Sequence, residues 1–416
     1  MTGKAKLQEA LNHRSGPLCM DLGSTAVTGI HVKCLEGLRH YYGLPAGPVK
    51  VCEPYQMLGE VDEDLLDLLG IDTVPMFPPN TIFGFRNKDW REYRLPWGQN
   101  VLVSSHFQTT EDTNGDLLIY PTGDRSAPPS GRMPMGGFFF DTIVRQEPID
   151  EDKLDPADNL EEFGPLSDGD LDYFRAEAQR LAGTQRGVVA TFPGTAFGDI
   201  ALVPAPFLAH PKGIRDIAEW YVTTASRQDY VHAIFTRQCE LALENLAKIH
   251  AIVGDLVDAV FLCGTDFGTQ TSQFCSADTF ESLYAPYYRR INDWIHTHTE
   301  WKAFKHSCGA VEPLIAGIID CGFDILNPVQ CSAVGMDPQA LKDTYGERTV
   351  FWGGGVDTQK TLPFGTPAQV REEVLKRCEI FSRDGGFVFN PIHNVQANTP
   401  VENVVAMFEA IKEFRG

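Results

Sequence analysis

The sequence predicts an α/β fold: a (β/α)8 TIM barrel with an antiparallel β insertion in its N-terminal half. Short apolar runs of strand length alternate with segments of helical pattern, which indicates a parallel sheet with crossover helices. The clearest units lie in 257–394, and each strand there ends in polar residues capable of chemistry. Polar residues at the C-terminal ends of successive strands are typical of the catalytic face of a TIM barrel.

Five of the eight expected strands lie in this C-terminal half, in the segments VDAVFLC, WKAFKHS, FDILN, TVFWG and GFVFNP. Each is followed by a helical pattern, as in AVEPLIAGIIDCG after the second. The residues after these strands that could carry chemistry are Asp266, Gln270, His306, Cys308, Asn327, Gln330, Cys331, Asp357 and His393.

The N-terminal half is harder to interpret. It begins with an amphipathic helix over 4–12, followed by the strand PLCMDLG, after which His31 lies in the next segment. IDTVPMFPP and GVVATFPG are the other two expected barrel strands, and 55–69 has a helical pattern with acidic residues on its outer face. Between them, 83–147 alternates with period two and reads as an antiparallel excursion that includes a flexible stretch over 126–137. We expect one domain over 1–416, with this insertion either covering the substrate side or forming a peripheral hairpin.

The composition excludes several classes of protein. A hydrophobic content of 43% is enough for a large core, and the formal charge of -21 argues against a nucleic-acid binder or a partner of anionic membranes. No apolar run approaches the length of about 18 residues that spans a bilayer. The ten cysteines are scattered without a paired framework, so we expect a cytoplasmic, reduced protein.

The sharpest local signal is the pair His306 and Cys308. Imidazole nitrogen and thiolate sulfur are favoured zinc ligands, and a two-residue offset at a strand end can direct both at one point. A third ligand must come from another strand end, where His393 and Cys331 are the candidates. His393 also suits general acid/base work, and Asp266 suits orientation of a substrate or capping of the next helix. The glycines at 353–355 lack the lysine of a phosphate loop, so we reject a nucleotide site.

At these residues the chain resembles the uroporphyrinogen decarboxylase superfamily, through CGTDFGTQ, KHSCGAVEPLI, DILNPVQ, WGGGVDTQ, LPFGTP and FNPIHNVQANTP. The resemblance covers nearly the whole chain and implies the same barrel fold. The decarboxylases carry an arginine-rich N-terminal signature that binds substrate carboxylates, whereas the first strand here ends in DLGSTAVTG. Unpaired carboxylates are costly to desolvate, so this departure favours the methyltransferase branch, whose members are corrinoid-dependent.

That branch moves a methyl group between a small compound and the cobalt of cobalamin carried on a separate corrinoid protein. Its thiol-methylating members hold zinc by an H-x-C pair and a distal cysteine, and His393 takes the distal place here. The resemblance therefore implies an enzyme of O-demethylation that uses zinc, with a methyl ether as the favoured substrate. Asp266 and His393 are the expected catalytic residues. The expected substrate-binding residues are Asn327, Gln330, Gln270, His31 and Asp357.

Two other functions remain open from the sequence. One is a metal-independent decarboxylase, or lyase, that uses Asp266 and His393 as acid and base. The other is a barrel that only binds a corrinoid protein. The resemblance also implies a homodimer. The sequence does not distinguish aromatic ethers, sugar ethers and methylated amines as methyl donors.

Overall fold

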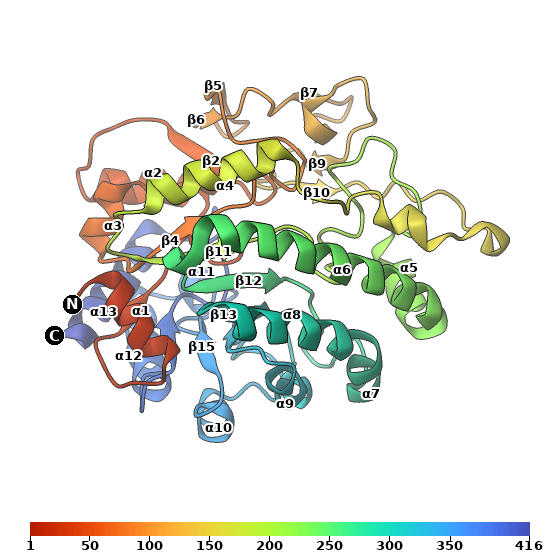
Figure 1. Ribbon diagram of the computed structural model, residues 1–416. Helices are drawn as coiled ribbons and strands as arrows, with labels where there is room; N and C mark the ends of the chain where they lie inside the picture. The colour runs from red at the N-terminus through yellow and green to blue at the C-terminus, as the bar shows by residue number, and fades with distance from the viewer.

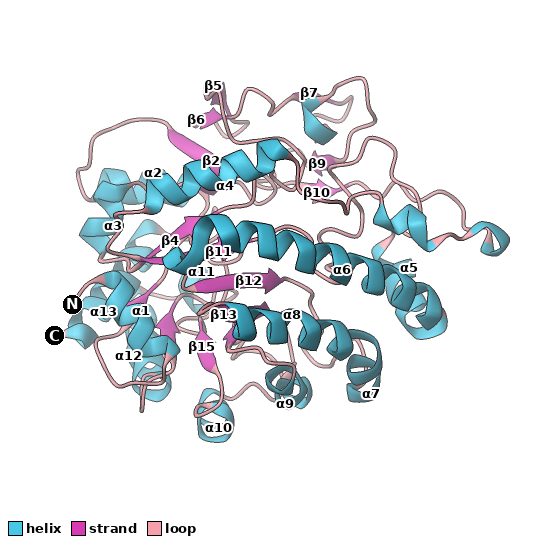
Figure 2. Ribbon diagram, viewed as in Figure 1, coloured by secondary structure: helices cyan, strands magenta, loops and turns pink.

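The computed structural model describes residues 1–416 and contains an eight-stranded parallel barrel (Figures 1 and 2). The strands are β1 (Cys19–Met20), β4 (Thr73–Met76), β11 (Gly187–Thr191), β12 (Ala259–Cys263), β13 (Lys302–His306), β14 (Ile325–Asn327), β15 (Val350–Trp352) and β16 (Phe387–Phe389). Each expected barrel strand is present, three before residue 257 and five after it, so the predicted TIM barrel is confirmed.

The strands are arranged in the order β1-β16-β15-β14-β13-β12-β11-β4, and each strand pairs in parallel with its neighbours in this order. Asp72, just before β4, joins the two end strands. Its backbone N–H donates to the Met20 carbonyl at 2.8 Å, and its carboxylate accepts from the Met20 N–H at 3.0 Å. The barrel is therefore nearly closed.

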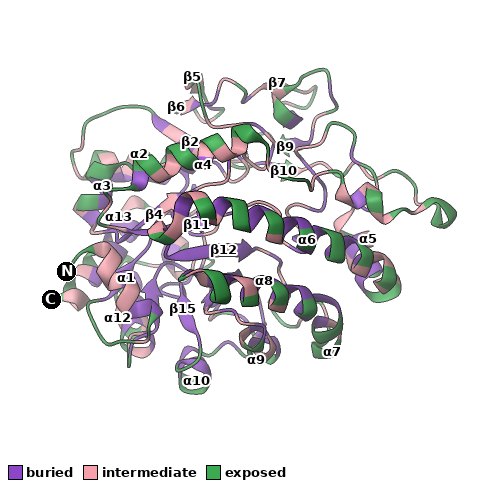
Figure 3. Ribbon diagram, viewed as in Figure 1, coloured by how far each residue is buried: buried purple, intermediate pink, exposed green.

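Helices surround the barrel, with α6 and α8 lying along the strands in Figure 1. Figure 3 shows buried strands and helices whose outer faces are exposed, as expected for amphipathic crossover helices. The α-helices are α1 (Gly3–Leu11), α2 (Val32–Tyr41), α3 (Glu63–Leu69), α4 (Asp168–Leu181), α5 (Ile217–Ser226), α6 (Gln228–Val253), α7 (Ala277–Thr279), α8 (Ala285–His298), α9 (Glu312–Asp320), α10 (Pro338–Tyr345), α11 (Thr361–Phe364), α12 (Pro367–Phe381) and α13 (Val401–Arg415). Short 3-10 turns are η1 (Pro121–Gly123), η2 (Glu151–Lys153), η3 (Pro156–Leu160) and η4 (Gly254–Leu256), and η5 (Phe280–Tyr284) is a π-helical turn.

Helix α1 closes the end of the barrel where the strands begin. Its apolar residues Leu7, Ala10 and Leu11 pack with inward-facing residues of seven strands in one buried cluster. The strand residues of this cluster are Cys19, Val189, Ala259, Phe304, Ile325, Val350, Trp352 and Val388. The barrel interior is therefore a packed core, and the chemistry-capable residues lie above it at the opposite end.

The two ends of the chain meet at one buried carboxylate. Lys6 Nζ lies 3.0 Å from Asp72 Oδ1, and the Arg415 guanidinium donates to Asp72 Oδ2 at 2.5 Å. Arg415 also donates to the Leu18 carbonyl, so helices α1 and α13 are both fixed beside β1. The termini lie side by side at the left of Figure 1, and the β12 arrow points away from them.

The insertion contributes strands to two small sheets. One contains β3 (Leu58–Gly59), β2 (Val49–Glu53), β6 (Asn100–Val103) and β5 (Arg91–Arg94), and the other contains β10 (Asp141–Thr142), β9 (Gly131–Met133), β8 (Leu117–Ile119) and β7 (Thr109–Glu111). Antiparallel pairing dominates, as expected for 83–147, but β6 also pairs in parallel with β2, which precedes the insertion. The stretch over 126–137, expected to be flexible, contains β9, which pairs with β8 and β10.

The helix expected over 55–69 is confirmed only from Glu63 onward. Before it, the Glu53 carboxylate accepts the backbone N–H groups of Tyr55 and Gln56 and forms a turn. Leu58 and Gly59 then pair with β2, so tertiary pairing overrides the local helical pattern. None of the helices combines the length and hydrophobicity needed to cross a membrane.

Candidate metal centre

The alternation of side chains along β13 places its last residue in the barrel. Phe304 belongs to the interior cluster, and His306, two residues on, lies above it with a ring-centroid distance of 6.3 Å to Phe261. Lys305 points the other way, toward the helices. Its ammonium lies 4.9 Å from the centre of the Phe267 ring and donates to the Thr265 carbonyl. Because the side-chain period of a strand is two, His306 faces the mouth of the barrel and Lys305 does not.

His306, which ends β13, meets Cys308 and His393 at this mouth, and the latter two lie in the loops after β13 and β16. One potential ligand atom from each lies within 4.8 Å of the others. The Cys308 Sγ to His306 Nε2 distance is 3.4 Å, and the two imidazole centroids are 5.6 Å apart. Two imidazoles and a thiol leave an open position on a tetrahedral ion, which is the donor pattern of catalytic zinc sites.

Asn327 lies at the end of β14, beside His306. Its Oδ1 is 2.5 Å from His306 Nδ1, and its Nδ2 donates to the Trp352 carbonyl at 2.7 Å. Since a carbonyl oxygen only accepts, Nδ1 carries the imidazole proton and Nε2 keeps its lone pair on the side of Cys308. Asn327 was expected to bind substrate, whereas here both ends of its amide bind protein groups.

Asp266 and Gln330 bind the loop that carries Cys308. The Cys308 N–H donates to Asp266 Oδ1 at 2.7 Å, and the Gly309 N–H donates to Gln330 Oε1 at 2.7 Å. Asp266 Oδ1 also lies 3.7 Å from His306 Nε2, so the carboxylate borders the cluster. Both residues thus contact the backbone that aims the thiol.

Burial sets the charge state of the cluster. It lowers the pKa of His306 to about 4, and the hydrogen bond to Asn327 only partly offsets this effect. Burial, followed by the neighbouring His306, lowers the pKa of His393 to about 4 as well, with Asp266 acting in the opposite direction. Burial raises the pKa of the Cys308 thiol. Both imidazoles are therefore neutral at pH 7, which suits a ligand better than a proton donor.

Four of the expected site residues lie elsewhere. Cys331 is outside the cluster, and its thiol contacts the Val329 carbonyl at 3.3 Å. Gln270 is exposed on the loop after β12. His31 caps helix α2, with Nδ1 accepting from the Lys33 N–H and Nε2 bonded to the Phe138 carbonyl. Asp357 accepts from the N–H groups of two following residues and so forms a local turn.

Sequence reasoning did not identify two residues near the cluster, Asp199 and Tyr221. A Cβ added to Gly264, two residues before Asp266, would lie 2.6 Å from Asp199 Oδ2, so the carboxylate covers the loop after β12. Burial, followed by the charge of Asp266, raises the pKa of Asp199 to about 6. The Tyr221 hydroxyl is buried without a hydrogen-bond partner, and its ring stacks on Phe274 at 4.5 Å. Burial, followed by the charges of Asp266 and Asp199, raises the pKa of Tyr221, which places this residue beside them. The one feature of the sequence that could have indicated Asp199 is the position of an aspartate within an otherwise apolar loop.

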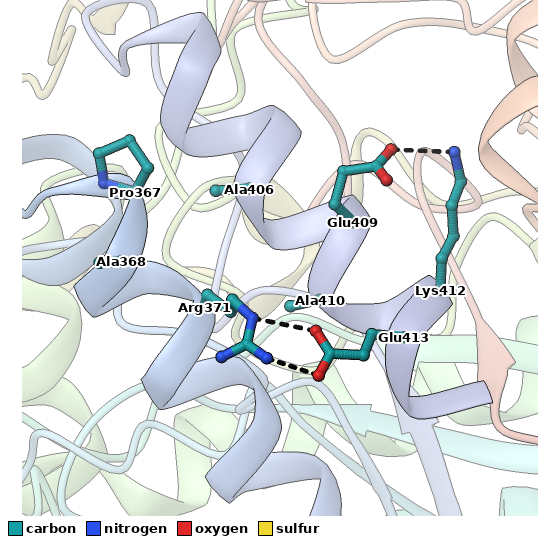
Figure 4. A pocket seen from close by; sticks show the side chains of 8 residues that line it. All are labelled: Pro367, Ala368, Arg371, Ala406, Glu409, Ala410, Lys412 and Glu413. Atoms are coloured by element: carbon teal, nitrogen blue, oxygen red, sulfur yellow. Dashed lines mark hydrogen bonds and ion pairs between the residues drawn. The ribbon is translucent and has the colours of Figure 1, made fainter. Parts of the chain in front are cut away.

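A surface groove of about 520 Å³ lies between α12 and α13, on the outer helical layer (Figure 4). Ala406 and Ala410 lie between its charged residues. Glu413 is paired with Arg371, and Glu409 with Lys412, so each carboxylate is already neutralised. The groove contains no cluster of metal ligands, and the chemistry of this chain concentrates at the barrel mouth.

These features define a TIM-barrel protein with a candidate metal centre at the catalytic face. The chain belongs to the uroporphyrinogen decarboxylase family, because the family model of that description matches residues 199–414, just over half of the sequence. A solved structure described as a methyltransferase from Methanosarcina mazei covers 100% of both chains at 16% identity with a TM-score of 0.54, which supports the fold. No curated protein matches the sequence.

Two other solved structures match smaller parts of the chain. A D-psicose 3-epimerase, in the presence of D-fructose, has 11% identity over 60% of this chain and 82% of its own, with a TM-score of 0.29. A β-glycosidase has 12% identity over 58% of this chain and 71% of its own, with a TM-score of 0.30.

Proposed function

We propose that this protein is a zinc-dependent methyltransferase that moves a methyl group from a small methyl ether to the cobalt of a partner corrinoid protein. The observation that carries the proposal is the cluster of His306, Cys308 and His393, whose ligand atoms lie within 4.8 Å of one another at the barrel mouth. The whole-chain likeness to a Methanosarcina mazei methyltransferase supports it. All ten cysteines are free, which fits a cytoplasmic location.

The donor set fits zinc. His306 would bind through Nε2, because its Nδ1 proton is held by Asn327, and His393 is neutral near pH 7. Burial raises the pKa of the Cys308 thiol, so only a bound cation would hold it as the thiolate ligand. One thiolate with two imidazoles makes a harder Lewis acid than a thiolate-rich set, which favours an oxygen leaving group.

The proposed reaction breaks the bond between the methyl carbon and the ether oxygen. Cobalt(I) of the partner protein is the methyl acceptor and supplies the electron pair of the new carbon–cobalt bond, while the oxygen keeps the pair of the broken bond and ends as a hydroxyl after taking a proton from water. When bound, zinc would supply Lewis-acid stabilisation of the departing oxygen. Asp266 holds the Cys308 backbone, and the unpaired Tyr221 hydroxyl is available to the polar end of the substrate.

The metal content of the purified protein tests the proposal. We expect about one zinc per chain in the wild type, and loss of the metal in Cys308→Ala and in His393→Ala. Cys331→Ala is the matched control, since it removes a thiol that lies outside the cluster, and it should keep its zinc. Methyl transfer to cob(I)alamin, followed by its absorbance, should be abolished with the metal. A wild type without zinc would contradict the metal mechanism.

A metal-independent decarboxylase of the family's own type is the second candidate, because Asp266 borders His393 closely enough for each charge to affect the other's pKa. It predicts carboxylate loss that survives chelation. Porphyrinogen itself is disfavoured, since Asp21 follows β1 where the resemblance places arginine, and its carboxylate accepts from Trp352 Nε1 and Thr73 Oγ1. Chelator-resistant activity would favour this second function over methyl transfer.

A further inference from the structure

The segment 327–330 follows β14 and lies directly beside the metal cluster. Its two amide side chains, Asn327 and Gln330, are buried, with exposed fractions of 0% and 4%. Each amide oxygen already has a protein partner, because Asn327 Oδ1 is bonded to His306 Nδ1 and Gln330 Oε1 accepts from the Gly309 N–H. The two bonds bracket Cys308 on either side in the sequence.

We propose that Asn327 and Gln330 are positioning residues of the metal centre, which fix the His306 tautomer and the path of the Cys308 loop. This inference rests on the proposed metal site and assigns both residues a role that differs from the substrate binding expected from the sequence. Hydrogen bonds from outside a metal's ligand set commonly orient the ligands and contribute about 10–100-fold in metal affinity.

The orientation of the Asn327 amide is determined by its other end. Nδ2 faces the Trp352 carbonyl at 2.7 Å, an acceptor that a flipped amide oxygen would repel. Oδ1 must therefore face His306, where it accepts the Nδ1 proton. The proton-free Nε2 is then held 3.4 Å from Cys308 Sγ, ready for a shared ion.

The backbone of this segment is held tightly in place. Val329 has a φ of 54°, a left-handed conformation that a β-branched residue rarely adopts. Glycines after β15 pack against it: a Cβ on Gly353 would lie 2.8 Å from the Pro328 carbonyl oxygen, and one on Gly354 would lie 3.1 Å from Val329 Cβ. The triple glycine that resembles a phosphate loop thus allows close support of the segment that orients the metal ligands.

Cobalt(II) is the probe for the test, because its visible spectrum reports the ligands directly. We expect Asn327→Ala and Gln330→Ala to weaken cobalt binding by about 10–100-fold and to alter the thiolate-to-cobalt band. Gln330→Glu keeps the accepting oxygen and should recover most of the affinity, whereas Asn327→Asp places a second oxygen against the Trp352 carbonyl and should recover less. Asn292→Ala is the matched control. Asn292 lies in helix α8, is as buried as Asn327, and donates to the Cys321 carbonyl at 2.7 Å.

A second measurement separates this inference from the proposed function. In metal-free protein labelled with ¹⁵N-histidine, NMR should show His306 protonated at Nδ1 in the wild type and partly at Nε2 in Asn327→Ala. Unchanged tautomer and unchanged cobalt affinity in that variant would overturn the inference, as would an equal loss of affinity in Asn292→Ala. A tautomer change in a protein that binds no metal would support the positioning role and refute the metal mechanism.

Discussion

Truncation of Leu7 to alanine tests whether helix α1 is an integral part of the barrel. The side chain is fully buried, and a Cβ on Gly187 would lie 2.2 Å from its Cδ2, so the fit against β11 is close. Leu7→Ala removes three carbon groups, worth about 2.4 kcal/mol at about 0.8 kcal/mol each. The remaining cavity raises the loss of stability to about 3–4 kcal/mol, within the usual range for buried leucine.

The expected change in melting temperature follows from chain length. At about 2.1 cal/mol/K per residue, the 416 residues give an unfolding entropy of about 0.9 kcal/mol/K. Leu7→Ala should therefore lower Tm by about 3–5 °C in calorimetry. Glu9→Ala on the same helix is the control, because its ion pair with Arg14 lies at the surface, where the Arg14 side chain is 65% exposed, and contributes little. Equal small shifts in both variants would refute the view that α1 seals a packed interior.

Two further predictions concern the mouth and its support. Folding raises the pKa of Asp199 to about 6, so ionisation of this carboxyl destabilises the protein increasingly as pH rises from about 4 to 6, and the loss persists at higher pH. Asp199→Asn should therefore raise Tm by up to about 3 °C at pH 7.5 in thermal unfolding. The gain should vanish toward pH 4. A gain that is equal at both pH values would contradict this. Gly355→Ala places a Cβ 2.3 Å from Phe389 Cε2 and should cost about 1–3 kcal/mol in denaturant unfolding, whereas Gly47→Ala, with open space around it, should match the wild type. Identical midpoints for the two variants would contradict it.

The barrel could be predicted from the sequence because each βα unit is local. A buried parallel strand leaves a short apolar run, and the helix after it restores a period near 3.6, as in 301–320. The pairing of the insertion's strands is less local than that of the barrel. The insertion's period-two alternation indicates antiparallel neighbours such as β5 and β6, but the parallel pairing of β6 with β2 joins distant segments and leaves no local pattern. Gly131–Met133 lies in a proline- and glycine-rich stretch, yet becomes the strand between β8 and β10.

The candidate site could be predicted only in part. His306 and Cys308 share one strand end, so a two-residue spacing reveals them, and His393 meets them because β16 ends at the same mouth. The sequence does not show whether a polar residue contacts a ligand or instead hydrogen-bonds to another residue of the site. Asn327 and Asp357 both follow barrel strands, but one bonds His306 and the other caps a turn. Asp199 reaches the site from a loop, and loops have no periodic pattern of apolar residues that would indicate where their side chains point.

The shared anchoring of helices α1 and α13 at Asp72 gives this chain a topology that can be rewired. Lys6 and Arg415 reach the same carboxylate, so a short glycine-rich linker from residue 416 to residue 1 would cross only the face where the strands begin. New ends opened in the hairpin turn after β7, where the Asn114 and Gly115 positions are exposed or partly exposed, would create a circular permutant. In such a protein the candidate metal ligands keep their order along the chain but lie nearer its new N-terminus, while the strands that position them remain neighbours.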